Sequence, residues 1–248
     1  MPTRTFFDLP AERRARLVEE AVFEFSERTY AEASLSQIAQ RSRIAKGSFY
    51  QYFADKLDLY RWLVSEEAPR HKRAFIGAAP STGDYWRDFT RTIERGMAFI
   101  VEHPRLARLT AAAADPSASP EVRGLHTAIC QAGVDELRAQ LERGVADGQI
   151  QVAGLDLDVA TRLVSAVIGP GLTDVILKEL GAELHEVLAS DSLRKQLGPA
   201  RRQRLAAQAV MLIRGGLSTA HRIVTPEPKR PRSSERAAGG HTNRKKSR

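Results

Sequence analysis

Cysteine is nearly absent from this sequence. Cys130 is the single one among 248 residues, which excludes an intrachain disulfide framework and any all-cysteine metal site. Its place in a segment with helical periodicity favours a small buried hydrophobe over a redox trigger. The six histidines form no HExxH or HxH pattern and have no neighbouring carboxylate cluster, so the sequence predicts neither a metal site nor a cofactor.

Long apolar runs and catalytic constellations are lacking as well. No stretch approaches the ~20 continuous apolar residues of a membrane span, and the N-terminal stretch has no apolar core of a signal peptide. We therefore expect a cytoplasmic protein with no membrane partner. No nucleophile–base pair, carboxylate pair or metal constellation stands out, so an enzyme is not expected.

Positive charge is present but unevenly distributed. The net charge is +8, and residues 226–248 hold eight Lys or Arg against Glu227 and Glu235, which gives +6 there and leaves +2 for the rest. This tail is rich in Pro, Ser and Gly and has no apolar residue larger than Ala, so we expect it to be disordered. It either adds sequence-independent affinity for phosphates or is a solvated, dispensable tail.

The pattern of apolar residues predicts an all-α fold, because it recurs at helical spacing and shows no sustained alternation. A first long helix carries Val18, Ala21, Val22 and Phe25 on one face, after a start at Asp8 and Pro10. Further long helices are expected over about 84–103, 120–147, 158–180 with an interruption at 169–171, and 201–221. A break at 77–83 predicts three parts: a head over 1–75, a helical body over 84–225 and the basic tail over 226–248.

Two short helices joined by a tight turn are expected between Ser34 and Asp55. Ser34 followed by Gln37 is a capping-box pattern that starts the first of them. The second runs over about 46–53 and turns Phe49 and Phe53 inward. Such a pair packed on a longer helix is a helix-turn-helix, whose second helix enters the major groove of DNA.

The outward side of this second helix suits DNA. Gly47 permits close backbone approach, and the first-turn amides attract phosphate. Lys46 can reach a base edge or a phosphate, and tyrosine hydroxyls can donate to phosphates. The candidate DNA-binding residues are Ser34, Arg43, Lys46, Gly47, Ser48, Tyr50, Gln51, Tyr52 and Lys56.

This run resembles the DNA-binding domain of the TetR (tetracycline-repressor) family over about residues 10–70. The matching positions are Ser34, Ile38, Ala39, Ile44, Gly47, Ser48, Phe49, Tyr50, Phe53, Lys56 and Leu59. Two positions depart from the pattern. Arg43 replaces the turn glycine, so the turn either avoids positive φ or accepts strain of ~1 kcal/mol, and Arg43 could add a phosphate contact. Ala45 replaces the serine that usually caps the recognition helix.

The resemblance implies a homodimeric repressor that a small-molecule effector releases from a palindromic operator. The last two long helices, about 158–180 and 201–221, would pair with their copies as a four-helix bundle, with Gly169, Gly171, Gly215 and Gly216 permitting close approach. An effector pocket would lie in the body. Its candidate lining residues are Trp86, Phe89, Met97 and Ile100, with Phe99 beside them, although such a stripe is more often plain core.

The sequence leaves two alternatives open. The same regulator could act without a ligand or as an activator, since no residue separates these options. The chain could also be a helical enzyme or a partner-binding bundle without DNA binding.

Overall fold

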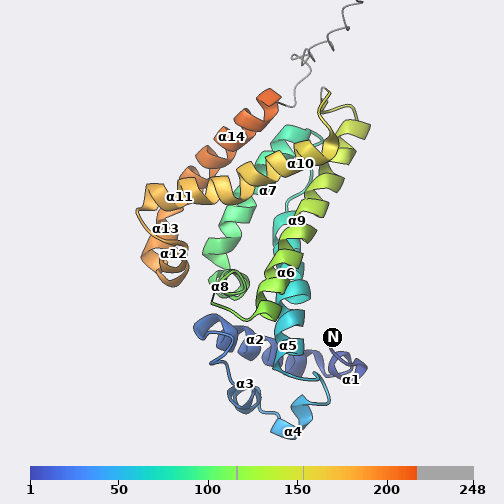
Figure 1. The fold of residues 1–248 in the computed structure, drawn as a ribbon, viewed down its shortest axis with the longest axis vertical. Helices are drawn as coiled ribbons and strands as arrows, with labels where there is room; N and C mark the ends of the chain where they lie inside the picture. Colours follow the sequence, from blue (N-terminus) through green and yellow to red (C-terminus); the bar gives the residue numbers. More distant parts are fainter. Residues whose placement is uncertain (116, 153, 217–248) are drawn as a thin grey trace, which may run out of the picture.

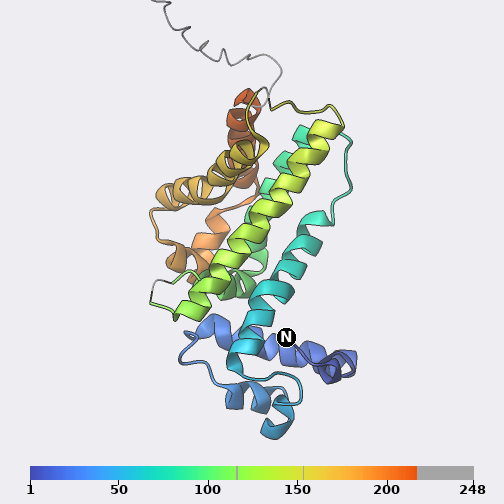
Figure 2. The ribbon, with the colours of Figure 1, turned by 45° about the vertical axis from the view of Figure 1, so that its right-hand side comes forward.

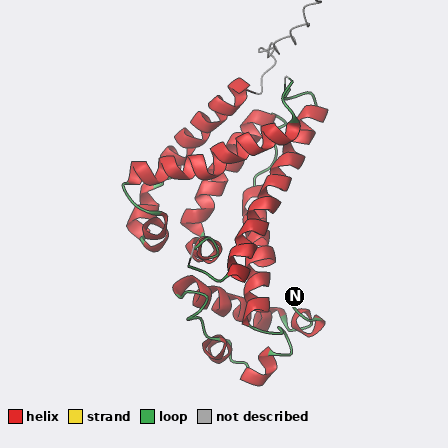
Figure 3. Cartoon of the chain, viewed as in Figure 1, coloured by secondary structure: helices red, strands yellow, loops and turns green. Residues whose placement is uncertain are grey.

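Helices are the only regular elements in residues 1–115, 117–152 and 154–216, the part of the chain that the computed structural model describes (Figure 3). The predicted all-α class is therefore confirmed. The predicted tail over 226–248 lies outside the described residues.

Five helices form the head at one end of the molecule (Figure 1). They are α1 (Arg4–Phe7), α2 (Ala11–Glu27), α3 (Leu35–Arg41), α4 (Lys46–Phe49) and α5 (Lys56–Trp62). The predicted inner face of α2 is confirmed, because Ala21, Val22 and Phe25 are buried. The expected cap is not: Pro10 stands at the N-cap of α2, and Asp8 instead ends α1. Four aromatic and aliphatic side chains, Phe25, Ile38, Phe49 and Phe53, lie in the core that this head encloses.

A continuous helical rod connects the head to the body (Figure 2). α5 passes through a π-helical turn, η1 (Leu63–Glu67), into α6 (Ala68–Gly77). Pro69 follows this wide turn and has no amide hydrogen for the carbonyl group one turn earlier, which explains the break in the α-helical ladder. The rod ends at the predicted break after Gly77.

The body contains the remaining helices. They are α7 (Tyr85–Glu102), α8 (Pro104–Ala112), α9 (Pro120–Ala146), α10 (Leu157–Ala166), the π-turn η2 (Val167–Gly171), α11 (Leu172–Leu180), α12 (Leu184–Ala189), α13 (Asp191–Gln196) and α14 (Pro199–Gly216). The starts of α7 and α9 follow their local chemistry, since Asp84 and Ser119 accept hydrogen bonds from first-turn amides. The predicted interruption over 169–171 is the π-turn η2. The short helices α12 and α13 have no counterpart among the predicted elements.

Head and body share buried contacts. α8 lies against α2, and Leu109 of α8 belongs to the same apolar cluster as Phe25 of α2. The hydroxyl of the buried Tyr60 in the rod donates to the carbonyl oxygen of Leu109 at 3.2 Å. The head is therefore docked directly on the body.

Several large apolar side chains of the body are exposed on α10, α11 and α14. The 24-residue stretch Leu157–Leu180, which spans α10, η2 and α11, is long enough to cross a membrane; its most apolar 18-residue window has a mean hydropathy of 1.4, and only 28% of that window is buried. Val159, Leu163 and Val175 are exposed on it, and Met211 and Leu212 are exposed on α14. These helices lie at the far end of the molecule from α4 (Figure 1).

Candidate nucleic-acid interface

The first short helix of the predicted helix-turn-helix begins at Ser34. The Ser34 hydroxyl accepts from the Gln37 amide at 3.4 Å, as expected for a helix N-cap. The reciprocal half of the capping box is different, because the Ser34 amide donates to the carboxylate of Glu24 at 2.9 Å. Ser34 therefore connects the start of α3 to α2.

Arg41 at the end of α3 makes a second connection to α2. Its Nε lies 2.7 Å from a carboxylate oxygen of Glu20, and its Nη2 lies 2.7 Å from Glu24. Burial alone raises the pKa of Glu24, but the hydrogen bonds from Arg41 and the Ser34 amide, with the charges of Arg41 and Arg28, outweigh it, so the pKa of Glu24 lies below its ordinary value. Glu24 is a positioning residue that the sequence patterns did not single out.

The turn between the two short helices accepts the left-handed conformation at Arg43. This residue has a φ of 56° and is the one residue other than glycine with positive φ among those described. Its amide donates to Gln40, and the Ile44 amide donates to Ala39, which is the hydrogen-bond pattern of a Schellman helix end. Of the two predicted possibilities for this turn, the strained one is present, and it leaves the Arg43 side chain exposed.

The second short helix, α4, is shorter than predicted. It covers Lys46–Phe49 instead of about 46–53, but hydrogen bonds from Gln51 to Ser48 and from Tyr52 to Phe49 continue the helical turns. Ala45 stands at its N-cap and provides no side-chain cap, as the replacement of serine predicts.

The inward and outward sides of this segment are largely as predicted. Phe49 and Phe53 are buried and stack on each other, with ring centroids 5.7 Å apart. Lys46, Gly47 and Gln51 are exposed, and Ser48 is half-buried. Tyr50 is 55% exposed, so its side chain lies outside the core. The sequence therefore forms a short exposed surface with one cation, one amide and one phenol at the end of the molecule.

Tyr52 does not belong to that exposed surface. Its predicted outward position is wrong, because the side chain is 7% exposed and belongs to the head core. The reason is α1, which precedes the motif: the ring of Phe6 lies 6.5 Å from the ring of Tyr52. α1 thus buries the side of the turn that the helix-turn-helix motif by itself would leave exposed to solvent.

Lys56 also has a different environment from the one predicted. Its ammonium group donates to the carbonyl oxygens of Tyr30, Ala31 and Ala33 at 2.8, 3.1 and 3.1 Å. It also lies 4.7 Å from the ring centroid of Tyr30. An ammonium group has three hydrogens, so these carbonyls use all of its donors. Lys56 is therefore a structural clamp on the loop before α3, and its prediction as a free phosphate contact is wrong.

The predicted effector residues lie mainly in the body core. Phe89 and Met97 are buried in it, and Trp86 is half-buried against it. Ile100 is half-buried at the other end of α7, next to the buried Phe99. None of these side chains lines the groove described below.

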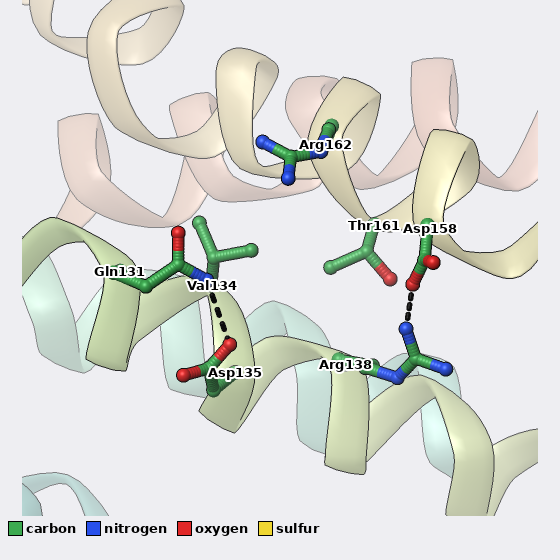
Figure 4. Close-up of a pocket in the computed structure, with 7 residues that line it drawn as sticks. All are labelled: Gln131, Val134, Asp135, Arg138, Asp158, Thr161 and Arg162. Atoms are coloured by element: carbon green, nitrogen blue, oxygen red, sulfur yellow. Dashed lines mark hydrogen bonds and ion pairs between the residues drawn. The ribbon is translucent and has the colours of Figure 1, made fainter.

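A shallow groove of about 220 Å³ lies between α9 and α10 (Figure 4). It is lined by Gln131, Val134, Asp135, Arg138, Asp158, Thr161 and Arg162. Arg138 forms an ion pair with Asp158 across one end of the groove, and the Gln131 amide donates to Asp135 at 2.8 Å on its floor. The groove is therefore polar.

The single cysteine lies on the surface of the body, and no metal-binding cluster is found among the described residues. They contain no group of three or more His, Cys, Asp or Glu that could hold a metal ion. Cys130 is exposed on α9, so its prediction as a buried hydrophobe is wrong. Its Sγ lies 3.5 Å from Nε2 of His126, one turn earlier.

Comparison with known proteins places this geometry among bacterial regulators. Residues 17–62 match the family model described as bacterial regulatory proteins, tetR family. A TetR-family transcriptional regulator from Chloroflexus aurantiacus is 32% identical, with a TM-score of 0.58 over 88% of this chain and 98% of that one.

Two further structures share the fold at lower identity. Bacillus subtilis FadR, solved with stearoyl-CoA, is 19% identical, with a TM-score of 0.57 over 82% of this chain and 98% of that one. A regulator from Mesorhizobium loti is 18% identical, with a TM-score of 0.59 over 87% and 99%. None of the curated proteins matches the sequence.

Proposed function

Because the chain belongs to the TetR family of DNA-binding transcriptional regulators, which are not enzymes, we propose that it is a homodimeric repressor released from a palindromic operator by a small-molecule effector. As a regulator of this kind it would act in the cytoplasm, where its operator DNA lies.

The observation that carries the DNA-binding part is the exposed surface of α4 and the turn after it. Lys46 and Gln51 are exposed there, and Tyr50 is more than half exposed, while Phe49 holds the helix to the head core. A lysine and an amide can read base edges in the major groove, and a phenol can donate to a phosphate oxygen. We infer that Gly47 permits the close approach and that Arg43, Lys46, Tyr50 and Gln51 make the contacts.

The apolar surface of α10, α11 and α14 supports the homodimer. Val159, Leu163, Val175, Met211 and Leu212 are exposed on these helices, and large apolar residues that gather on one exposed face mark interaction sites. A bilayer would have to accept Asp158, Arg162 and Asp174 from the same helical stretch, which is costly. A second copy of the chain could cover the apolar residues and leave those charges at the rim, so we favour it as the occupant. Two heads related by a two-fold axis would then reach half-sites about one helical turn of DNA, ~34 Å, or a multiple of it apart.

The groove between α9 and α10 indicates which kind of effector the protein would bind. The FadR relative was solved with stearoyl-CoA. In the present chain the groove between α9 and α10 measures about 220 Å³ and is lined mostly by charged and amide side chains. Ligand sites for drug-sized molecules are usually ~300–1,000 Å³ and mostly apolar. This groove therefore suits a small polar effector better than an acyl chain.

Selection of bound sequences from random duplex DNA tests the proposal. The protein should be used both complete and without residues 226–248, because the charges of that segment alone would produce salt-dependent binding to any duplex. We expect enrichment of one inverted repeat by both forms. Recovery of duplexes with no common sequence would contradict the proposed function.

A further inference from the structure

The N-terminal segment with Thr3 and α1 contacts the end of the helical turns over residues 46–53, which we call the recognition turn. The family model matches residues 17–62, whereas Thr3 and α1 lie before it. The Thr3 amide donates to the carbonyl oxygen of Tyr52 at 2.9 Å, and the Thr3 hydroxyl donates to the carbonyl oxygen of Gln51 at 2.6 Å. Both carbonyls lie at the carboxyl end of the helical turns that begin with α4.

The Thr3 hydroxyl donates a hydrogen bond at a position where a hydroxyl ordinarily accepts one. Thr3 is the N-cap residue of α1, where a threonine hydroxyl ordinarily accepts from an amide of its own helix. Here no side chain caps α1, because the hydroxyl donates to Gln51 instead. Carbonyls at the end of a helix have no partner within it, so Thr3 acts as a C-terminal cap for the recognition turn from a distant part of the chain.

Phe6 fixes the position of α1 against the head core, so that Thr3 can donate its hydrogen bonds to Gln51 and Tyr52. Its side chain is fully buried, with ring centroids 5.0 Å from Phe53 and 5.0 Å from Trp62. The aromatic cluster therefore anchors α1 to the head core, and Thr3 lies at the exposed edge of that anchor beside Gln51.

We propose that Thr3 is a positioning residue for DNA recognition. Its two hydrogen bonds set the backbone at Gln51 and Tyr52, and so the direction in which Tyr50 and Gln51 present their side chains to the major groove. The proposal rests on the proposed function, and it assigns part of operator specificity to a residue outside the family region.

The test compares Thr3→Val, which keeps the shape but loses the hydroxyl donor, with Thr3→Ser, which keeps the donor. Thr5→Val is the matched control, because Thr5 is exposed on α1 and has no hydrogen bond to α4 or the turn among the described residues. Each protein is titrated against the selected operator and against a scrambled duplex, and its melting temperature is measured. Loss of one hydrogen bond predicts about a threefold to tenfold fall in the ratio of operator to scrambled affinity for Thr3→Val. Thr3→Ser and Thr5→Val should keep the wild-type ratio.

The ratio separates positioning from a merely structural role. A residue that only stabilises the fold would lower the melting temperature or both affinities together and leave the ratio unchanged, and that result would overturn the proposal. An equal ratio for Thr3→Val and wild type at an unchanged melting temperature would overturn it too. If the wild-type protein prefers no duplex at all, the proposed function itself is wrong, and this inference fails with it.

Discussion

The ammonium group of Lys56 lies 2.8 Å from the carbonyl oxygen of Tyr30 and 4.7 Å from the centre of the same residue's ring. Two further carbonyls, of Ala31 and Ala33, complete its coordination. A residue that the motif suggests as a DNA contact therefore closes the loop between α2 and α3.

Replacing Lys56 by Met should destabilise the protein rather than its complex with DNA. Hydrogen bonds from a charged donor contribute ~1.5–3 kcal/mol, so we expect the free energy of unfolding to fall by about 2–3 kcal/mol in urea denaturation. The folded fraction should bind the operator with the wild-type dependence on salt, because the ammonium group has no donor left for a phosphate.

Lys46→Met should weaken DNA binding and leave the stability of the protein almost unchanged, which is the reverse of the result expected for Lys56→Met. The Lys46 side chain is exposed and has no hydrogen bond or ion pair within the described ranges, so the free energy of unfolding should change by less than about 0.5 kcal/mol. Operator affinity should fall, and the slope of log K against log salt should become shallower by about 0.9 for each protomer in the complex. A shallower slope for Lys56→Met with an unchanged slope for Lys46→Met would reverse the assignment of the two lysines.

The elements that the sequence predicts well depend on neighbours within one or two helical turns. Asp84 and Ser119 cap the helices that follow them directly, and Phe49 and Phe53 are one turn apart on the same face. Such relations are visible in the order of residues alone. Helices α12 and α13 have six residues each, too few for a helical period to stand out.

The errors arise where a distant segment decides the environment of a side chain. Tyr52 is buried because α1, more than forty positions earlier, packs on it. The partners of Lys56 lie 23 to 26 positions earlier. Periodicity within residues 46–56 contains no information about either contact, so it assigns both side chains to solvent and hence to DNA.

Arg43→Gly should raise the stability of the protein and lower its affinity for the operator. The φ of 56° at this position costs a side chain of the L configuration about 1 kcal/mol, which glycine avoids. We expect a gain of up to about 1 kcal/mol in the free energy of unfolding, together with weaker operator binding and a shallower salt slope because a cation is lost. Arg43→Asn, which also tolerates this conformation, should lose the charge with a smaller gain in stability. A loss of stability for Arg43→Gly would contradict the strain at this turn.

The buried carboxylate of Glu24 predicts acid sensitivity. Because its pKa is lower in the folded protein than the ordinary 4.5, it contributes stability above about pH 4.5 that is lost as the pH falls through the folded-state pKa. Glu24→Gln should lower the free energy of unfolding by about 1–3 kcal/mol at neutral pH, since Arg41 and the Ser34 amide lose a charged acceptor.

The difference between wild type and Glu24→Gln should shrink as the pH is lowered below about 4.5, because the wild-type carboxylate then becomes protonated. Urea denaturation at a series of pH values measures this difference. Glu19→Gln, at an exposed position of the same helix, should follow wild type throughout. A difference that stays constant with pH would show that Glu24 acts by shape alone.

Leu163→Glu tests the apolar surface of α10, α11 and α14. Leu163 is 57% exposed, so a glutamate there leaves the fold of one chain intact. In a dimer that buries this surface the two carboxylates would be desolvated without partners, at a cost of about 3 kcal/mol or more. That cost corresponds to at least about 100-fold weaker dimerisation, which sedimentation equilibrium measures, and operator affinity should fall with it.

The control for this change is Ala128→Glu, which adds the same charge at an exposed position of α9 and should leave a dimer intact. The two alternatives for the apolar surface then give different results. A wild-type protein that sediments as a dimer without detergent, and a Leu163→Glu variant that sediments as a folded monomer, assign the surface to a second copy of the chain. A wild-type monomer that partitions into lipid vesicles, and loses that partitioning in Leu163→Glu, would instead assign it to a membrane, because the same charge that disfavours the dimer also disfavours transfer into lipid.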